Sequence, residues 1–183
     1  MFAQIGLYLV EAVFGFFVTM LLARFHFQWL RVPFRNQIGE FVIATTNWLV
    51  LPVRRVVPGL AGLDLPTLLL AWLLQGASLW IQTQIVGSDL SALALGAIAA
   101  VDLLRYSLYI LVFALIVQVL MSWINPYAPL APIFDAAVRP FVRPIRRLVP
   151  PIAGIDLSPA ILFILLQVLL FPVGALRVAA AAL

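Results

Sequence analysis

The chain has 183 residues, of which 65% are hydrophobic and only 10% charged, and its mean hydropathy is +1.15. Soluble domains carry about 25% charged residues, so this composition argues against a water-soluble globule and for a fold decided by the lipid bilayer. The net charge of +4 comes from eleven arginines and no lysine, and since they lie between apolar runs, anionic lipid headgroups suit them better than nucleic acid does.

The residue types that are missing narrow the chemistry. Without cysteine there are no disulfides, thiolate metal sites or cysteine nucleophiles, and with His26 as the only histidine one chain cannot build a metal site with two histidine ligands. Without lysine there is no P-loop lysine and no Schiff base. These absences exclude those particular chemistries, and we predict that the protein holds no metal and no cofactor.

Four apolar stretches predict membrane-spanning helices, each close to the 20 residues that cross a hydrocarbon core. They cover about 1–23, 65–86, 101–121 and 158–176. The third stretch belongs to a longer apolar run, 90–124, and we place residues 90–100 outside the helix as a short lumenal or re-entrant lead-in.

Arginines are concentrated in the two longer connections between these spans. The positive-inside rule therefore predicts a multi-pass protein with both large loops in the cytoplasm and both termini in the periplasm. Arg177, close to the carboxyl end, is the one arginine that disagrees with this orientation.

Each arginine-rich loop also contains apolar residues at helical spacing, among them Phe41 and Val42 in the first loop and Ile133 and Phe134 in the second. This spacing predicts a short amphipathic helix in each loop. Such a helix lies in the headgroup plane or packs on the cytoplasmic ends of the spans, and the two alternatives are compatible.

The two loops repeat one another at an offset of 92 residues, and the same offset pairs Gln75 with Gln167. The predicted fold is therefore an all-α membrane protein with four transmembrane helices in two tandem two-helix repeats, 1–90 and 91–183. In each repeat an amphipathic interfacial helix and an Arg-Pro-Gly loop lie between the two spans. Two spans per repeat give both repeats the same orientation, with a pseudo-two-fold axis along the membrane normal.

The repeated segments are Pro52-Val-Arg-Arg-Val-Val-Pro58 with Gly62-Leu-Asp64, and Pro144-Ile-Arg-Arg-Leu-Val-Pro150 with Gly154-Ile-Asp156. They resemble the signature of the YggT family (YlmG in plastids and cyanobacteria), here in its doubled form. The resemblance implies an integral inner-membrane protein of bacteria without known catalytic activity. It also implies links to cell division and nucleoid distribution, to assembly of a photosynthetic cytochrome complex, and to osmotic stress and potassium homeostasis.

The repeated loop residues are the first set of candidate site residues. Turns and helix caps account for proline, glycine and aspartate there, but the arginine pairs have four possible roles: orientation, binding of phosphate headgroups, binding of a protein partner, or ion pairs with the loop aspartates. Their identical placement in both repeats favours a structured role. The candidate lipid- or partner-binding residues are Pro52, Arg54, Arg55, Pro58, Gly62, Asp64, Pro144, Arg146, Arg147, Pro150, Gly154 and Asp156.

Polar residues within the spans are the second set, because ionisable groups in hydrocarbon are costly. They are Glu11, Gln75, Asp102, Arg105 and Gln167. Alignment of Trp29 with Trp123 sets Glu11 opposite Arg105, which predicts an ion pair between the repeats. The alternative is a local pair of Asp102 with Arg105, and for the glutamines hydrogen bonds between helices are the ordinary use.

Two functions are compatible with these features. The first is a non-enzymatic inner-membrane scaffold or assembly factor that binds lipid headgroups and protein partners, which the sequence does not identify, through the two basic loops. The second is an ion channel, a transporter or a regulator of potassium and osmotic homeostasis, which four spans could form only as a homo-oligomer. An aspartyl protease using Asp64 and Asp156 is rejected, because both residues lie at helix starts in basic loops, where they stay ionised and apart.

Overall fold

The structure is a computed structural model that describes residues 1–59, 62–150 and 156–183. In these ranges the chain forms six helices and no strand. The helices are α1 (Phe2–Trp29), α2 (Gln37–Arg54), α3 (Leu65–Val86), α4 (Ala92–Ile124), α5 (Ala131–Leu148) and α6 (Ser158–Ala180). Within the described ranges α1, α3, α4 and α6 are long and apolar enough to span a membrane, so the chain is an all-α, multi-pass membrane protein.

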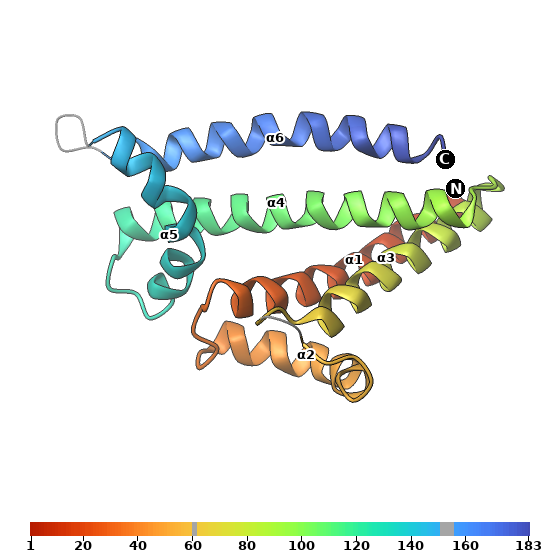
Figure 1. Ribbon diagram of the computed structural model, residues 1–183, viewed down its shortest axis with the longest axis horizontal. Coiled ribbons are helices and arrows are strands. Elements are labelled where there is room, and N and C mark those ends of the chain that lie inside the picture. Colours follow the sequence, from red (N-terminus) through yellow and green to blue (C-terminus); the bar gives the residue numbers. More distant parts are fainter. Residues whose placement is uncertain (60–61, 151–155) are drawn as a thin grey trace.

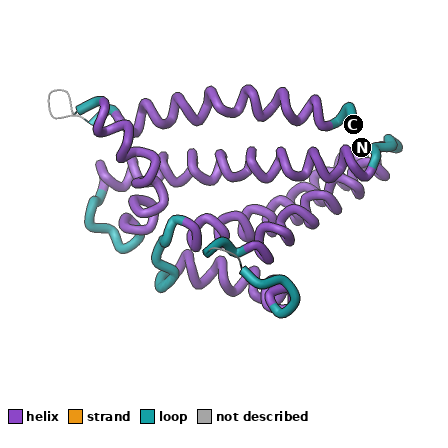
Figure 2. The backbone as a smooth tube through the Cα atoms, in the orientation of Figure 1, coloured by secondary structure: helices purple, strands orange, loops and turns teal. Residues whose placement is uncertain are grey.

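The helices form two groups that meet at one end of the molecule and separate towards the other (Figure 1). In the N-terminal half (1–90) α1 packs against α3, in the C-terminal half (91–183) α4 packs against α6, and α3 joins the halves by packing on α4. Both termini and the α3–α4 turn lie at one end, here called the terminus end, and the loops beside α2 and α5 lie towards the other, the loop end (Figure 2).

The short helices α2 and α5 connect the spans of their halves at the loop end. Asn36 starts α2, because its Oδ1 accepts a hydrogen bond from the Gly39 backbone N–H at 2.8 Å. Val42 and Val50 are buried on the inner face of α2, while Trp48 is exposed. Helix α5 buries Ile133, Val138 and Val142 against α4 and α6. Helices are therefore present where the apolar spacing predicts them.

The prediction for the third span is wrong. Helix α4 is one helix from Ala92 to Ile124, so residues 92–100 belong to it instead of forming a separate lead-in. Ser91 caps its start, with Oγ accepting from the Ala94 N–H at 3.0 Å. Gly96 does not interrupt it, because the indole N–H of Trp72 donates to the Gly96 carbonyl oxygen at 2.9 Å and holds α3 there. At 1.5 Å per residue α4 is about 50 Å long, well beyond a hydrocarbon core.

Two of the loop prolines that turns and caps were expected to explain, Pro52 and Pro144, lie inside helices instead. Helix α2 continues through Pro52 to Arg54, and α5 continues through Pro140 and Pro144 to Leu148. All three prolines are exposed, so they lie on the outer sides of their helices. Each removes one backbone hydrogen bond from its helix.

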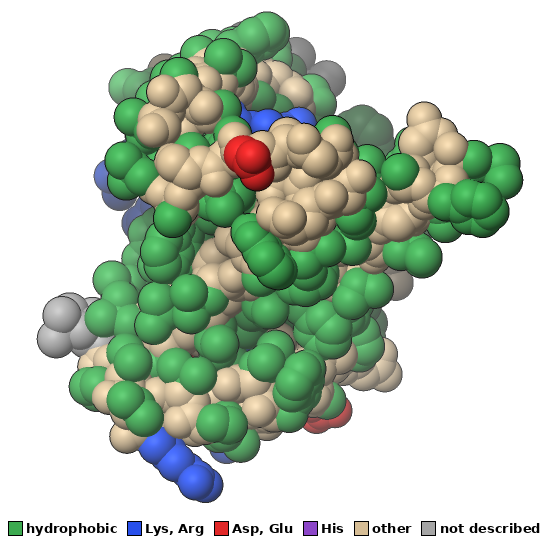
Figure 3. Space-filling view, turned by 90° about the vertical axis from the view of Figure 1, so that its right-hand side faces the viewer, with side chains coloured by type: hydrophobic (Ala, Val, Ile, Leu, Met, Phe, Trp, Pro, Cys, Tyr) green, Lys and Arg blue, Asp and Glu red, His purple; other side chains and the backbone are tan. Residues whose placement is uncertain are grey.

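Seen from the terminus end, the surface is mostly hydrophobic and carries few charged side chains (Figure 3). Exposed apolar side chains on the spans, such as Leu9, Phe113 and Phe171, are those a bilayer would cover. The charged groups therefore concentrate at two places, the loop end and a pocket between the spans.

Candidate functional site

A buried network surrounds Asp64 at the loop end of the N-terminal half. The Asp64 side chain is only 2% exposed and forms an ion pair with Arg54. It also accepts a hydrogen bond from the Thr67 hydroxyl at 2.6 Å, with Arg24 Nε 3.9 Å from Oδ2. Asp64 occupies the N-cap position of α3 but makes no side-chain bond to a backbone amide there. The expectation that Asp64 caps backbone amides is therefore wrong. Its carboxylate accepts a hydrogen bond from the Thr67 hydroxyl instead.

Arg24 ties three helices of this half together. It comes from α1 and is 6% exposed. Its Nη1 donates to Thr46 Oγ1 at 2.8 Å and to Asn47 Oδ1 at 2.9 Å, both on α2, while its Nε faces Asp64 at the start of α3. Sequence reasoning counted Arg24 only as a loop charge. Arg24 directly follows the apolar run and is followed at once by Phe25 and Phe27, and these apolar neighbours were the signal that it is buried.

The C-terminal half has the corresponding ion pair in a more open setting. Arg146 Nη2 lies 2.5 Å from Asp156 Oδ2, and the Asp156 side chain is 27% exposed. The Ser158 backbone N–H donates to Asp156 Oδ1 at 2.9 Å. Partial burial favours the neutral carboxyl, but hydrogen bonds from Ser158 and Arg146 outweigh it and hold the pKa of Asp156 below its ordinary value. Asp156 is therefore ionised at neutral pH.

The arginine pairs divide in the same way in both halves. Arg54 and Arg146 form the ion pairs with the loop aspartates. Their neighbours Arg55 and Arg147 are exposed and take part in none of the ion pairs found among the described residues. In each pair one guanidinium is thus used inside the protein and the other faces outward.

The remaining loop candidates are backbone residues. Gly62 has a φ of 82°, a left-handed conformation that favours glycine. Pro58 and Pro150 are both exposed. Gly154, the counterpart of Gly62 named from the sequence, lies outside the described residues.

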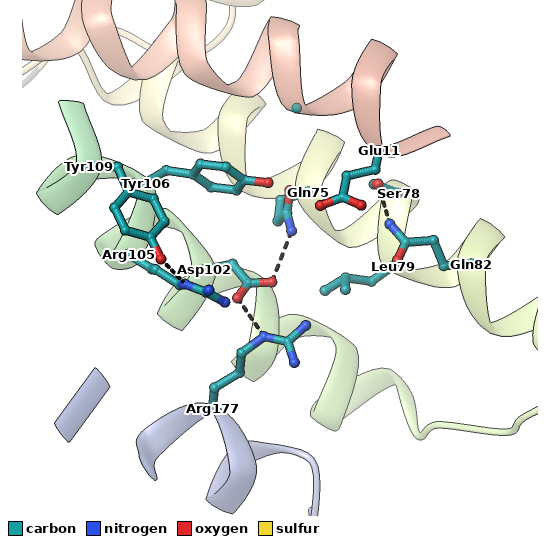
Figure 4. Close-up of a pocket in the computed structure, with 11 residues that line it drawn as sticks. Glu11, Gln75, Ser78, Leu79, Gln82, Asp102, Arg105, Tyr106, Tyr109 and Arg177 are labelled. Atoms are coloured by element: carbon teal, nitrogen blue, oxygen red, sulfur yellow. Dashed lines mark hydrogen bonds and ion pairs between the residues drawn. The ribbon is translucent and has the colours of Figure 1, made fainter. Parts of the chain in front are cut away.

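A second polar site lies between the spans towards the terminus end (Figure 4). It is a pocket of about 170 Å³ lined by side chains from α1, α3, α4 and α6. Asp102 is at its centre, with its Oδ2 accepting from Gln75 Nε2 at 2.9 Å and its Oδ1 accepting from Arg177 Nε at 2.7 Å. Asp102 therefore connects α4 to both α3 and α6.

Glu11 and Arg105 face this pocket, but the predicted pair between them is not among the ion pairs of the described residues. Arg105 Nε instead donates to the Tyr109 hydroxyl at 2.9 Å, and its guanidinium lies 5.4 Å from the centre of the Tyr109 ring. The alternative local pair of Asp102 with Arg105 is also not formed, because Asp102 binds Arg177.

The pocket contains four of the five candidates taken from the spans, and Gln167 of α6 is not among its lining residues. Sequence reasoning missed Arg177 as a member. It had appeared only as an exception to the positive-inside rule, and the structure accounts for the exception, because the charge of Arg177 is matched by Asp102.

No group of three or more His, Asp or Glu residues that could hold a metal occurs in the described part of the chain. Asp64 and Asp156 belong to different halves, and each has its own arginine.

Comparison with known proteins gives one family. A model of the family described as CCB3/YggT matches residues 3–95 and 97–176. The chain is 32% identical over 170 residues to "Uncharacterized protein PA0392" of Pseudomonas aeruginosa, covering 90% of this chain and 85% of that protein. It is 32% identical over 164 residues to YggT of Escherichia coli K12, covering 88% and 85%. The names of these relatives give no activity, and no solved structure matches the chain.

Proposed function

The chain belongs to the CCB3/YggT family, and we propose that it acts as a non-enzymatic scaffold or assembly factor of the bacterial inner membrane. In this proposal the two basic loops lie in the cytoplasm and hold anionic lipid headgroups and protein partners. The termini lie in the periplasm, and the halves are tandem copies of one unit related by a pseudo-two-fold axis.

The observation that carries the proposal is the division of each arginine pair. Arg54 and Arg146 form ion pairs with aspartates of the same half, while Arg55 and Arg147 are exposed and belong to none of the ion pairs of the described residues. An exposed guanidinium at the membrane surface is suited to bidentate contacts with phosphate or carboxylate groups. The amphipathic helices α2 and α5 add apolar surface at the same level.

The first experiment compares two double variants of the full chain, each purified in detergent and reconstituted in nanodiscs of mixed lipids. Arg55→Gln with Arg147→Gln should reduce the anionic lipid that co-purifies with the protein and leave its melting temperature unchanged. Arg54→Gln with Arg146→Gln should lower the melting temperature instead, since it removes the internal ion pairs. Unchanged lipid content in the Arg55/Arg147 variant would contradict the proposal.

The protein-partner part of the proposal needs a separate test in native membranes. A photo-crosslinking side chain at position 147 should give a discrete adduct, and the same side chain at the exposed apolar position 171 on α6 should give none. Identical adduct patterns from both positions would mean that the loop has no special affinity for a partner.

Ion conduction is the second candidate, because charged side chains from α1, α3, α4 and α6 surround the pocket. Two features weigh against it. Asp102 is paired with Arg177, and the buried apolar residues Val18, Leu21 and Leu22 follow the pocket residues Glu11 and Gly15 along α1 towards the loop end. Potassium flux from liposomes that contain the protein decides between the candidates. Flux above that of empty liposomes that changes in Asp102→Asn would favour conduction, and no flux from folded, inserted protein would favour the scaffold.

A further inference from the structure

At the loop end the C-terminal half has a pocket of about 410 Å³ between α4 and α5. Its polar lining consists of Gln118 of α4 and of Asp135, Arg139, Arg143 and Arg146 of α5. The buried residues Val138 and Val142 form its apolar wall.

In the N-terminal half an arginine occupies the matching place. Aligning Trp29 with Trp123 sets Gln118 at the position of Arg24. The Arg24 guanidinium reaches α2 and donates to Thr46 and Asn47 there. With the shorter amide of Gln118 at this position, the C-terminal half lacks an internal guanidinium, and the space remains open to a ligand.

The groups around this space are those of a binding site. Gln118 Oε1 is buried and has no hydrogen-bond partner among the described residues, and a buried acceptor without a donor is costly. Arg143 is exposed and belongs to none of the ion pairs found in the described ranges, while Arg139 and Arg146 are matched by Asp135 and Asp156. Three guanidinium charges against two carboxylates leave one positive charge.

We infer that this pocket binds the headgroup of an anionic phospholipid that carries a hydroxyl group beside its phosphodiester, as phosphatidylglycerol does. The phosphodiester supplies the single negative charge for Arg143 and its neighbours, and the headgroup hydroxyl donates a hydrogen bond to Gln118 Oε1 once the side-chain amide turns towards the pocket. The inference rests on the proposed function and makes it more specific, because it assigns one lipid of defined chemistry to the C-terminal half.

A lipid is a better occupant than a free phosphate compound because of the helix that forms the pocket. Phe134 and Phe141, on α5, line a separate apolar groove between the halves. A helix that presents arginines on one side and aromatic residues on another lies at the level of the headgroups, where its basic side meets lipid phosphates.

The test measures lipid binding to the purified full chain by native mass spectrometry, with phosphatidylglycerol, phosphatidylethanolamine and soluble glycerol phosphate as probes. The wild-type chain should retain one phosphatidylglycerol and bind phosphatidylethanolamine at least tenfold more weakly. Glycerol phosphate should not displace the lipid. Displacement by glycerol phosphate, or equal binding of the two lipids, would overturn the inference.

Two variants probe the pocket itself. Gln118→Arg should fill the space with a guanidinium, as Arg24 does in the other half, and weaken phosphatidylglycerol binding at least tenfold. Arg143→Gln, at an exposed position that the fold does not depend on, should weaken binding similarly even if Gln118→Arg fails to fold. Arg35→Gln, which removes an exposed arginine outside both loop motifs, is the matched control and should leave binding unchanged.

The outcomes separate this inference from the proposed function. If the Arg55/Arg147 variant loses anionic lipid and neither pocket variant does, the proposed function stands and the pocket assignment is wrong. If the pocket variants lose phosphatidylglycerol and the Arg55/Arg147 variant behaves like wild type, the pocket stands and the proposed role of the outward arginines fails.

Discussion

Asp64 and Asp156 have the same place in the repeated motif but different surroundings. Asp64 is 2% exposed and faces Arg24 and Arg54, whereas Asp156 is 27% exposed and pairs with Arg146. Removing one partner of a buried ion pair leaves an uncompensated charge, but an exposed pair in water contributes little to stability. The two aspartates should therefore differ in their contribution to folding.

Asp64→Asn should lower the free energy of unfolding by about 3 kcal/mol, because the buried guanidinium of Arg24 loses its nearby carboxylate. Asp156→Asn should cost about 1 kcal/mol or less. Chemical denaturation of both variants in the same detergent checks the difference. Equal losses of unfolding free energy in the two variants would show that the burial of Asp64 does not determine how much its ion pairs stabilise the fold.

For individual residues, the repeated motif predicted which side chains lie at the loops but not how deeply they are buried. The deciding difference, Arg24 against Gln118, lies outside the repeated segments. The sequence also did not identify Asp102 as the partner of Arg177. The two residues are 75 positions apart in the chain, and only the packing of α4 on α6 brings them together. Composition and spacing carry no information on such contacts.

Among the elements, the turn from α1 into α2 has the tightest backbone packing around a glycine. Gly39 is buried in the first turn of α2, and a Cβ atom there would overlap the Phe34 carbonyl group of the preceding loop. The same turn is held by the Asn36 cap. Glycine is thus required at this position by the close approach of two backbone segments.

Gly39→Ala should destabilise the protein by about 2 kcal/mol or more, since two backbone segments must separate to admit the methyl group. Gly76→Ala in α3 is the matched control, because a Cβ there has no neighbour within 4 Å and alanine is the better helix former. Melting temperatures of the two variants give the comparison. A Gly39→Ala protein as stable as Gly76→Ala would contradict the tight turn.

The elements were predictable to different degrees. Leu65 to Val86 is a helix with the predicted bounds, because a proline marks its start and Gly87, in the left-handed conformation, marks its end. The start of α4 was mispredicted because span length was used as the criterion where the sequence has no helix breaker. Tertiary contact with Trp72, which a single sequence does not show, supports that extra length.

For the whole molecule, the all-helical, four-span architecture followed from hydropathy, but the divergence of the two halves did not. The orientation across the membrane is a prediction from the arginine count, and the structure adds that both termini lie at the same end as the α3–α4 turn (Figure 1). The absence of cysteine from the natural chain makes this prediction easy to test.

Single cysteines should divide into two classes with a membrane-impermeant thiol reagent. In spheroplasts Ser88→Cys and Ala182→Cys should react, because they lie at the terminus end. Arg35→Cys and Arg147→Cys should react only after the membrane is permeabilised. The reverse pattern would place the basic loops in the periplasm and remove the cytoplasmic part of the proposed function.

The separation of the halves towards the loop end gives the molecule the outline of a wedge. A wedge inserted in a bilayer displaces more lipid from the leaflet that contains its broad end than from the opposite leaflet. If every copy inserts in the same direction, each adds to the same difference in area between the two monolayers. Crowding of such copies then favours membrane curvature, with the leaflet of the loop end on the convex side.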